Sequence, residues 1–132
     1  MAGPLLRLVC TPGNLDGAPE GWAGTMLKEG EIALLVDAGG LEAISAVAHS
    51  LDVEAVALLR PEQTAERQEE TVMRYAAAKP LVWIADSFGD AARAWARDRG
   101  PMTLLVETGD ALSADERRRV ERFVVILGRQ DE

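Results

Sequence analysis

A short apolar segment that ends in an acidic residue, followed closely by glycine, occurs three times in this chain. The copies are Ile32–Gly40 (IALLVDAGG), Leu81–Gly89 (LVWIADSFG) and Met102–Asp110 (MTLLVETGD). Parallel strands that are buried on both faces form near-continuous apolar runs of this kind, bounded by turn residues. The repeat therefore predicts strand–turn–helix units in a parallel sheet.

The remaining sequence continues the alternation of strands and helices. Ser113 and Glu116 form an S-x-x-E capping box that predicts the start of the last helix, and residues 15–30 are expected to be a glycine-rich loop with one helical turn near 22–28. We expect strands at 5–10, 32–37, 54–59, 81–86, 102–107 and 123–127, and helices at 41–51, 62–78 and 90–99. With right-handed crossovers, this order predicts a single three-layer α/β/α domain over residues 1–132, Rossmann-like or flavodoxin-like, with a mainly parallel sheet of five to six strands.

The apolar positions of the helices predict which side chains face the core. Leu41 and Ile44 should point inward in the helix at 41–51, and Ala65 and Val72 in the helix at 62–78. The strand at 81–86 is apolar throughout, which indicates a central position in the sheet.

The net charge of −8 is unevenly distributed. Residues 1–70 carry twelve acids and four bases, whereas residues 71–132 carry ten of each. A negative field repels nucleic acids and anionic membranes, so we expect the chain to bind neither. No apolar run approaches the roughly 20 residues of a membrane helix. One cysteine, Cys10, fits a reducing compartment, and we expect a cytoplasmic protein.

The carboxyl ends of the strands are the expected binding edge, because ligands of open α/β sheets bind there at the point where strand order reverses. Helix N-termini at this edge offer amides to anions, and clustered carboxylates suit Mg²⁺. The candidates for binding a small phosphorylated ligand are Asn14, Gly39, Gly40, Arg60, Ser87, Gly89, Thr108 and Gly109. The candidate metal ligands are Asp37, Asp86, Glu107 and Asp110.

The same acidic residues have a structural interpretation as helix caps and turn residues. Neither G-x-G-x-x-G nor G-x-x-x-x-G-K-[ST] is present. His49, the only histidine, is expected on the polar face of its helix, and Cys10 is expected to fill the core. Trp22 is a candidate for a ligand lid or a subunit contact. Acidic residues lie next to and between the arginines of the last helix, which predicts a solvated, partly paired helix face. These arginines are Arg117, Arg118, Arg119 and Arg122.

Two partial resemblances bear on the acidic strand ends. Asp37, Asp86 two strands later and Thr108 resemble the pattern of response-regulator receiver domains, although no lysine closes the last strand at Gly128-Arg129. Residues 53–107 are similar to βα units of thiamine phosphate synthase-like barrels, on the strength of Ala57–Arg60 and Val82–Asp86. The second resemblance implies Mg²⁺ and pyrophosphate binding by Arg60 and Asp86, but the lysine expected after Arg60 is missing.

Three functional hypotheses follow, and the sequence does not decide whether the chain is an enzyme. The first is a non-catalytic or regulatory module that binds a small phosphorylated ligand or a protein partner at the carboxyl edge. The second is a Mg²⁺-dependent phosphate-transfer or phosphate-ester enzyme that uses the strand-end carboxylates. The third is a degenerate domain that acts in oligomerisation or scaffolding, with Trp22 and the arginine-rich helix at contacts.

Overall fold

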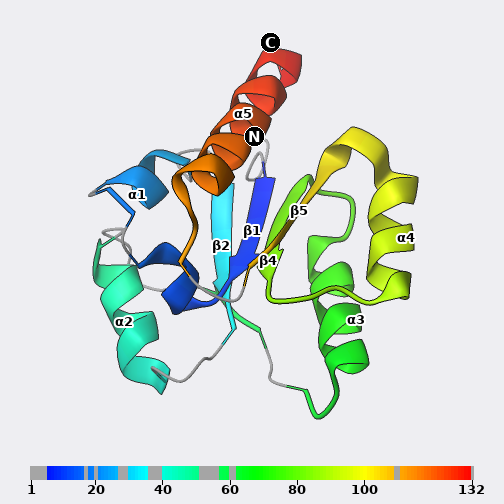
Figure 1. The fold of residues 1–132 in the computed structure, drawn as a ribbon, viewed down its shortest axis with the longest axis horizontal. Helices are drawn as coiled ribbons and strands as arrows, with labels where there is room; N and C mark the ends of the chain where they lie inside the picture. The colour runs from blue at the N-terminus through cyan, green and yellow to red at the C-terminus, as the bar shows by residue number, and fades with distance from the viewer. Residues whose placement is uncertain are drawn as a thin grey trace.

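Five parallel strands in the order β3-β2-β1-β4-β5 form one sheet in the computed structural model of the chain (Figure 1). The strands are β1 (Leu6–Cys10), β2 (Gly30–Leu34), β3 (Ala57–Leu58), β4 (Leu81–Ala85) and β5 (Thr103–Glu107). The structure describes residues 6–16, 18–19, 21–26, 30–35, 40–50, 57–59, 62–108 and 111–131, without the side chains of 23, 50 and 128–131. This strand order confirms the predicted single α/β fold. Of the two predicted forms it matches the Rossmann-like order and not the flavodoxin-like one.

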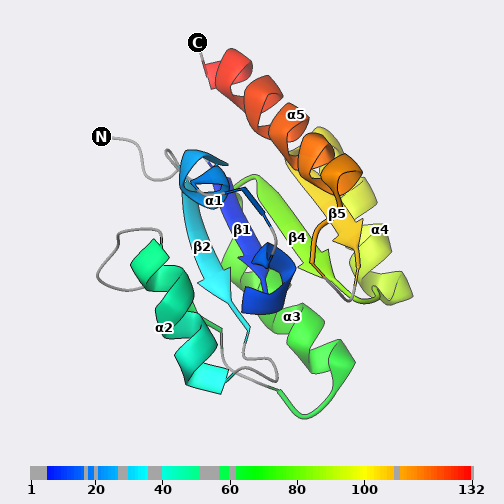
Figure 2. The same cartoon turned by 60° about the vertical axis from the view of Figure 1, so that its left-hand side comes forward.

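Helices cover both faces of the sheet (Figures 1 and 2). One face carries α1, α2 and α5, whose apolar side chains pack with Leu8, Leu34 and Ile84. The other face carries α3 and α4, which pack with Val9 and Trp83. The helix bounds are α1 (Trp22–Met26), α2 (Gly40–Ser50), α3 (Ala65–Ala76), α4 (Asp90–Arg99) and α5 (Ala114–Asp131), with short 3₁₀ helices η1 (Pro12–Leu15) and η2 (Gly100–Met102). No helix within these ranges is long and apolar enough to cross a membrane.

Strand β4 lies inside the sheet, as its apolar sequence predicts. It pairs with β1 on one side and with β5 on the other. Leu81 and Trp83 point to the α3–α4 face, whereas Val82 and Ile84 point to the opposite face. Because successive side chains alternate between faces, a strand covered by helices on both sides needs apolar residues at every position.

The predicted final strand at 123–127 is wrong, because these residues belong to α5. The predicted capping box is present: Glu116 N–H donates to Ser113 Oγ, and Ser113 N–H donates to Glu116 Oε1. From this start the helix continues through the apolar run, and Val120 and Leu127 are buried seven residues apart on one face. The short apolar run resembled a strand because its period is ambiguous over five residues.

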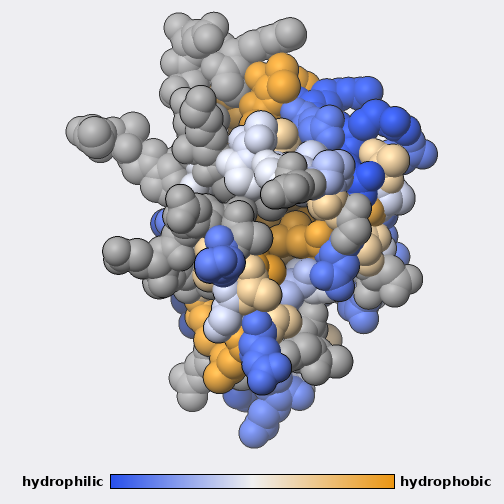
Figure 3. All heavy atoms as spheres, turned by 90° about the vertical axis from the view of Figure 1, so that its left-hand side faces the viewer, coloured by the Kyte–Doolittle hydropathy of each residue, from blue (hydrophilic) through white to orange (hydrophobic). Residues whose placement is uncertain are grey.

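Some predicted core positions are also wrong. Leu41 is 66% exposed in the first turn of α2, and Ala65 is exposed in the first turn of α3, where the helix has not yet reached the sheet. Leu58 on the short edge strand β3 is 48% exposed. Figure 3 shows apolar residues at the surface on the α1–α2 side of the molecule, between hydrophilic ones. Ile44 and Val72 are buried as predicted.

A polar cluster connects the sheet to α3. Tyr75 O–H donates to Glu31 Oε1 at 2.7 Å, and Arg7 Nε lies 2.7 Å from the same oxygen. The Arg7 guanidinium also lies 4.7 Å from the centre of the Tyr75 ring and donates to the Tyr75 carbonyl oxygen. Burial, and then the hydrogen bond and the negative charge of Glu31, raise the pKa of Tyr75. The cluster therefore holds Tyr75 in its neutral form.

This raised pKa predicts a loss of stability at alkaline pH. The native state holds the phenolic proton more tightly than the unfolded state, so the stabilisation is complete below pH of about 10, the ordinary pKa of tyrosine, and falls above it. Tyr75 is the only tyrosine, so ultraviolet absorbance reports its ionisation without overlap. We expect the Tyr75 side chain of the native protein to form phenolate only well above pH of about 10, the ordinary pKa of tyrosine. The variant Tyr75→Phe should lack this part of the alkaline destabilisation. Formation of the Tyr75 phenolate in the native protein near pH of about 10 would contradict the raised pKa of this residue.

Candidate functional site

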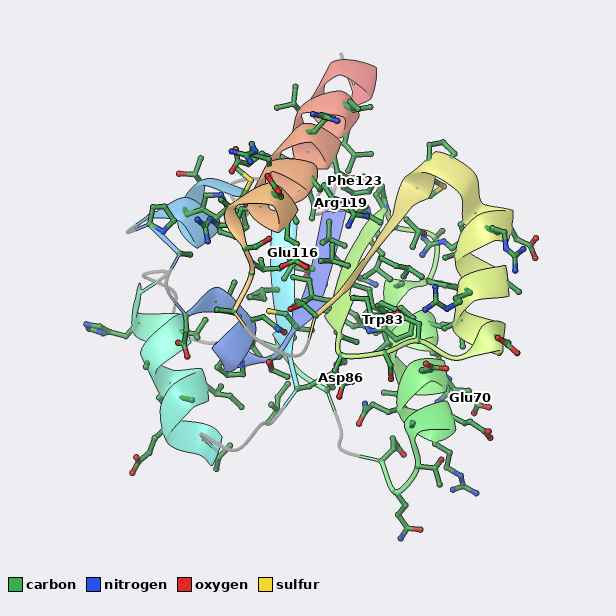
Figure 4. All side chains as sticks on the ribbon, in the orientation of Figure 1. Glu70, Trp83, Asp86, Glu116, Arg119 and Phe123 are labelled. Carbon is green, nitrogen blue, oxygen red and sulfur yellow. The ribbon has the colours of Figure 1, made fainter. Side chains whose placement is uncertain are left out.

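All five strands are parallel, so their carboxyl ends lie along one edge of the sheet, at the lower end of the sheet in Figure 1. Strand order reverses between β1 and β4, because the chain builds β2 and β3 on one side of β1 before adding β4 on the other. Ligands of open α/β sheets bind at such a switch point. Thr11 and Asn14 follow β1 here, and Asp86 follows β4 (Figure 4).

Asn14 holds the turn after β1 and is buried, with 4% of its surface exposed. Its Oδ1 accepts hydrogen bonds from the Thr11 N–H at 2.9 Å and the Thr11 hydroxyl at 3.0 Å. Its carbonyl oxygen accepts from the N–H of Leu112, which is itself 3% exposed. Leu112 follows β5 in the chain yet is bonded at the end of β1, two strands away. Asn14 therefore joins two loops at the switch point.

The N-terminus of α4 is occupied by a side chain of the protein itself. Gly89 N–H donates to Glu69 Oε2 at 2.8 Å, so α3 supplies the carboxylate that caps α4. A Cβ at position 89 would lie 3.1 Å from Glu69 Oε1, so a larger residue would require the Glu69 carboxylate to shift by a few tenths of an ångström. A phosphate bound at these amides would meet the Glu69 charge. The Glu69 carboxylate would therefore compete with an anionic ligand for the Gly89 amide, which the sequence predicted to bind the ligand.

Replacing Glu69 with alanine should lower the free energy of unfolding by about 1 kcal/mol, because the amide of Gly89 and the α4 dipole lose their anionic partner. Glu70→Ala is the matched control, because Glu70 is the exposed neighbour on the same helix and the substitution removes the same charge (Figure 4). Urea denaturation of both variants makes the comparison. Equal losses in the two variants would mean that Glu69 does not cap α4.

Two of the four candidate metal ligands, Asp86 and Glu107, lie among the described residues. Glu107 is in register with Ala85 on the α3–α4 face, and Arg93 of α4 binds it with Nη2 2.5 Å from Oε2. Asp86 is the next residue after Ala85 and is exposed. Asp37 and Asp110 lie outside the described residues. Within the described ranges, no three His, Cys, Asp or Glu side chains are grouped to hold a metal ion.

The other predicted ligand-binding positions are spread along the carboxyl edge. Gly40 begins α2 with φ of 65°, a conformation that favours glycine. Ser87 is exposed after β4, and Thr108 N–H donates to the Ala85 carbonyl oxygen at 2.7 Å, which extends the β4–β5 ladder. Gly39, Arg60 and Gly109 lie outside the described residues. Asn14, Gly40, Ser87, Gly89 and Thr108 all follow strand ends, as the sequence predicts.

Trp22 makes an internal contact. Its Nε1 donates to Glu121 Oε2 of α5 at 2.9 Å, and its ring packs against the core cluster on that face. This contact joins α1 to α5. The arginine-rich face of α5 is partly paired, as predicted: Arg118 binds Asp115, and Arg117 Nη1 donates to the Leu112 carbonyl oxygen at 2.8 Å. His49 is exposed and Cys10 is buried, which also agrees with prediction.

The structure also has a groove beside the outermost strand β5, which was not predicted from the sequence. It lies between α4 and the edge strand β5, and its lining residues are Arg93, Ala96, Arg97, Gly100, Thr103 and Leu105. On the opposite side of β5, Arg119 of α5 reaches the Leu105 carbonyl oxygen with Nη2 at 3.4 Å. The i,i+4 spacing of Arg93 and Arg97 was visible in the sequence. Their position beside an open strand depends on strand order, which the sequence did not reveal.

The fold and these two edges define a Rossmann-like α/β domain with an internally bonded carboxyl edge and an arginine-lined strand edge. Comparison with family models, curated proteins and solved structures gave no match to this chain.

Proposed function

We propose that this chain is a non-catalytic or regulatory module that binds a protein partner through the open edge of its sheet at β5. The observation that carries the proposal is the combination of an edge strand and a groove. Among the described strands, β5 pairs only with β4, and the groove between α4 and β5 runs beside it. Exposed sheet edges bind extended segments of other proteins by forming main-chain hydrogen bonds.

The bonding at the carboxyl edge supports a protein partner over a small phosphorylated ligand. Glu69 already occupies the α4 amide, Arg93 holds Glu107, and Asn14 joins two loops at the switch point. A ligand at this edge would have to displace these contacts. An added strand at β5 would leave the Glu69 and Asn14 contacts in place. It would need only the Leu105 carbonyl oxygen, which Arg119 contacts at 3.4 Å.

Two measurements on the full chain test this function. Selection from a random peptide display library should yield peptides that bind the protein. Thermal denaturation with Mg²⁺, inorganic phosphate and a nucleotide panel should show an unchanged midpoint. A ligand present at about 100 times its Kd would add about 2.7 kcal/mol to the free energy of unfolding, so binding would be readily seen.

Two outcomes would reject the proposal. A library that yields no binding peptide would contradict a partner site at the sheet edge. A midpoint raised by Mg²⁺ or a phosphorylated compound, and restored to its original value in Asp86→Asn, would favour the magnesium-dependent enzyme instead.

A further inference from the structure

We infer that the partner segment is an acidic, extended peptide that adds to β5 as a sixth strand, with acidic residues at alternate positions. This inference rests on the proposed function and specifies the chemistry of the partner. Its basis is the geometry of β5 and of the arginines on its two sides.

The backbone of β5 directs every second residue toward the open edge. Thr108 N–H bonds to Ala85 of β4, which sets the even-numbered residues of β5 toward β4. In a parallel ladder the N–H and C=O of one residue point to the same side, and those of its neighbours to the other. Thr103, Leu105 and Glu107 therefore direct their main-chain groups outward. The contact of Arg119 with the Leu105 carbonyl oxygen agrees with this assignment.

The spacing of the groove arginines matches an added strand. Arg93 and Arg97 are four residues apart on α4, which corresponds to about 6 Å along a helix. Two residues of a strand span about 6.6 Å and point to the same face. Acidic side chains at positions i and i+2 of an added strand would thus match the spacing of the two arginines. Arg97 would take the first acid directly, and Arg93 would share its guanidinium between Glu107 and the second. The intervening side chains would face Arg119 on the other side.

The groove has room and unused bonding capacity. Ala96 and Gly100 contribute little or no side chain to its lining. Arg97 is exposed and has no ion-pair partner in the described part of the chain. An acidic partner would supply an acceptor to the Arg97 guanidinium.

The overall charge of −8 opposes an acidic ligand only at long range. At physiological ionic strength the Debye length is about 8 Å, so charges beyond the groove are largely screened. Arg97 lines the groove beside β5 and has no ion-pair partner in the described part of the chain, so it supplies positive charge next to a bound strand. Binding should therefore weaken as salt is added, because the contacts are exposed ion pairs.

The test uses a fluorescent peptide of alternating glutamate and valine, measured by anisotropy against the full-length protein. Arg97→Glu should weaken binding by about tenfold or more, because one charge-assisted contact is lost and a repulsion replaces it. Arg67→Glu is the matched control: it makes the same change of charge on the exposed face of α3 and should leave affinity nearly unchanged. A lysine–valine peptide, and a glutamate–valine peptide N-methylated at alternate residues, should not bind.

Several results would overturn this inference. Equal losses in Arg97→Glu and Arg67→Glu would indicate only long-range attraction, and binding of the N-methylated peptide would exclude strand addition. Library peptides that bind but are not acidic, or that ignore Arg97→Glu, would reject the acidic partner while leaving the proposed function intact. Sedimentation that showed a dimer competing with the peptide would assign the edge to a second copy of the chain.

Discussion

Trp83→Ala is expected to lower the free energy of unfolding by about 3–5 kcal/mol, the range for removal of a large buried aromatic side chain. Trp83 is 2% exposed on the α3–α4 face of β4. Its ring meets Phe88 edge-on with the centroids 5.0 Å apart, and Trp95 edge-on at 6.2 Å. Alanine would leave a cavity at the position of Trp83, which Figure 4 labels beside β4. A domain of this size has a total stability of about 5–15 kcal/mol, so the loss would be a large part of it.

Urea denaturation followed by far-ultraviolet circular dichroism measures this effect without depending on tryptophan fluorescence. Trp95→Ala is the control, because Trp95 packs on the same cluster but is only half-buried and lies against the Arg99 guanidinium. Its loss should be clearly smaller. A Trp83→Ala variant no less stable than Trp95→Ala would contradict the placement of β4 inside the sheet.

Val125→Pro should lower the free energy of unfolding by about 3 kcal/mol, because proline inside a helix removes a main-chain hydrogen bond and clashes with the preceding turn. Val125 lies within α5 and is 52% exposed, so little of the loss comes from packing. The substitution would separate the buried anchor Leu127 from the rest of the helix. Urea denaturation again provides the measurement.

Val125→Ala distinguishes the helix from the strand that the sequence suggested. Alanine has a higher helix propensity than valine by a few tenths of a kcal/mol, whereas valine is favoured over alanine in strands. The helix therefore predicts that Val125→Ala is neutral or slightly stabilising while Val125→Pro is severe. Destabilisation by alanine would instead indicate a strand at 123–127, since proline is disfavoured inside both kinds of element.

Much of the fold was predictable because its units are local. The apolar run of β4, the glycine after it and the capping box of α5 each act within a few residues, so the sequence displays them directly. The run at 123–127 failed because five apolar residues fit a strand as well as a helix. Burial of Val120 and Leu127, seven residues apart, resolves the ambiguity through packing on the sheet.

The candidate site was less predictable because it depends on contacts between distant residues. The sequence located Asn14, Gly89 and Glu107 at strand ends, where the structure places them. It did not indicate that Glu69, twenty residues earlier, would cap α4, or that Arg93 would bind Glu107. The β5 edge was not foreseen, since any of several strands could have been outermost.

Amide hydrogen exchange of β5, measured residue by residue by NMR with and without the glutamate–valine peptide, shows whether a partner segment adds to the open edge of the sheet. In the free protein we expect the amides of Leu104 and Val106, which face β4, to exchange slowly, and those of Leu105 and Glu107 to exchange fast. Peptide binding should protect Leu105 and Glu107 selectively. Protection that instead develops at Ser87, Gly89 and Thr108, with Leu105 unchanged, would contradict strand addition at β5 and place the binding site at the carboxyl edge of the sheet.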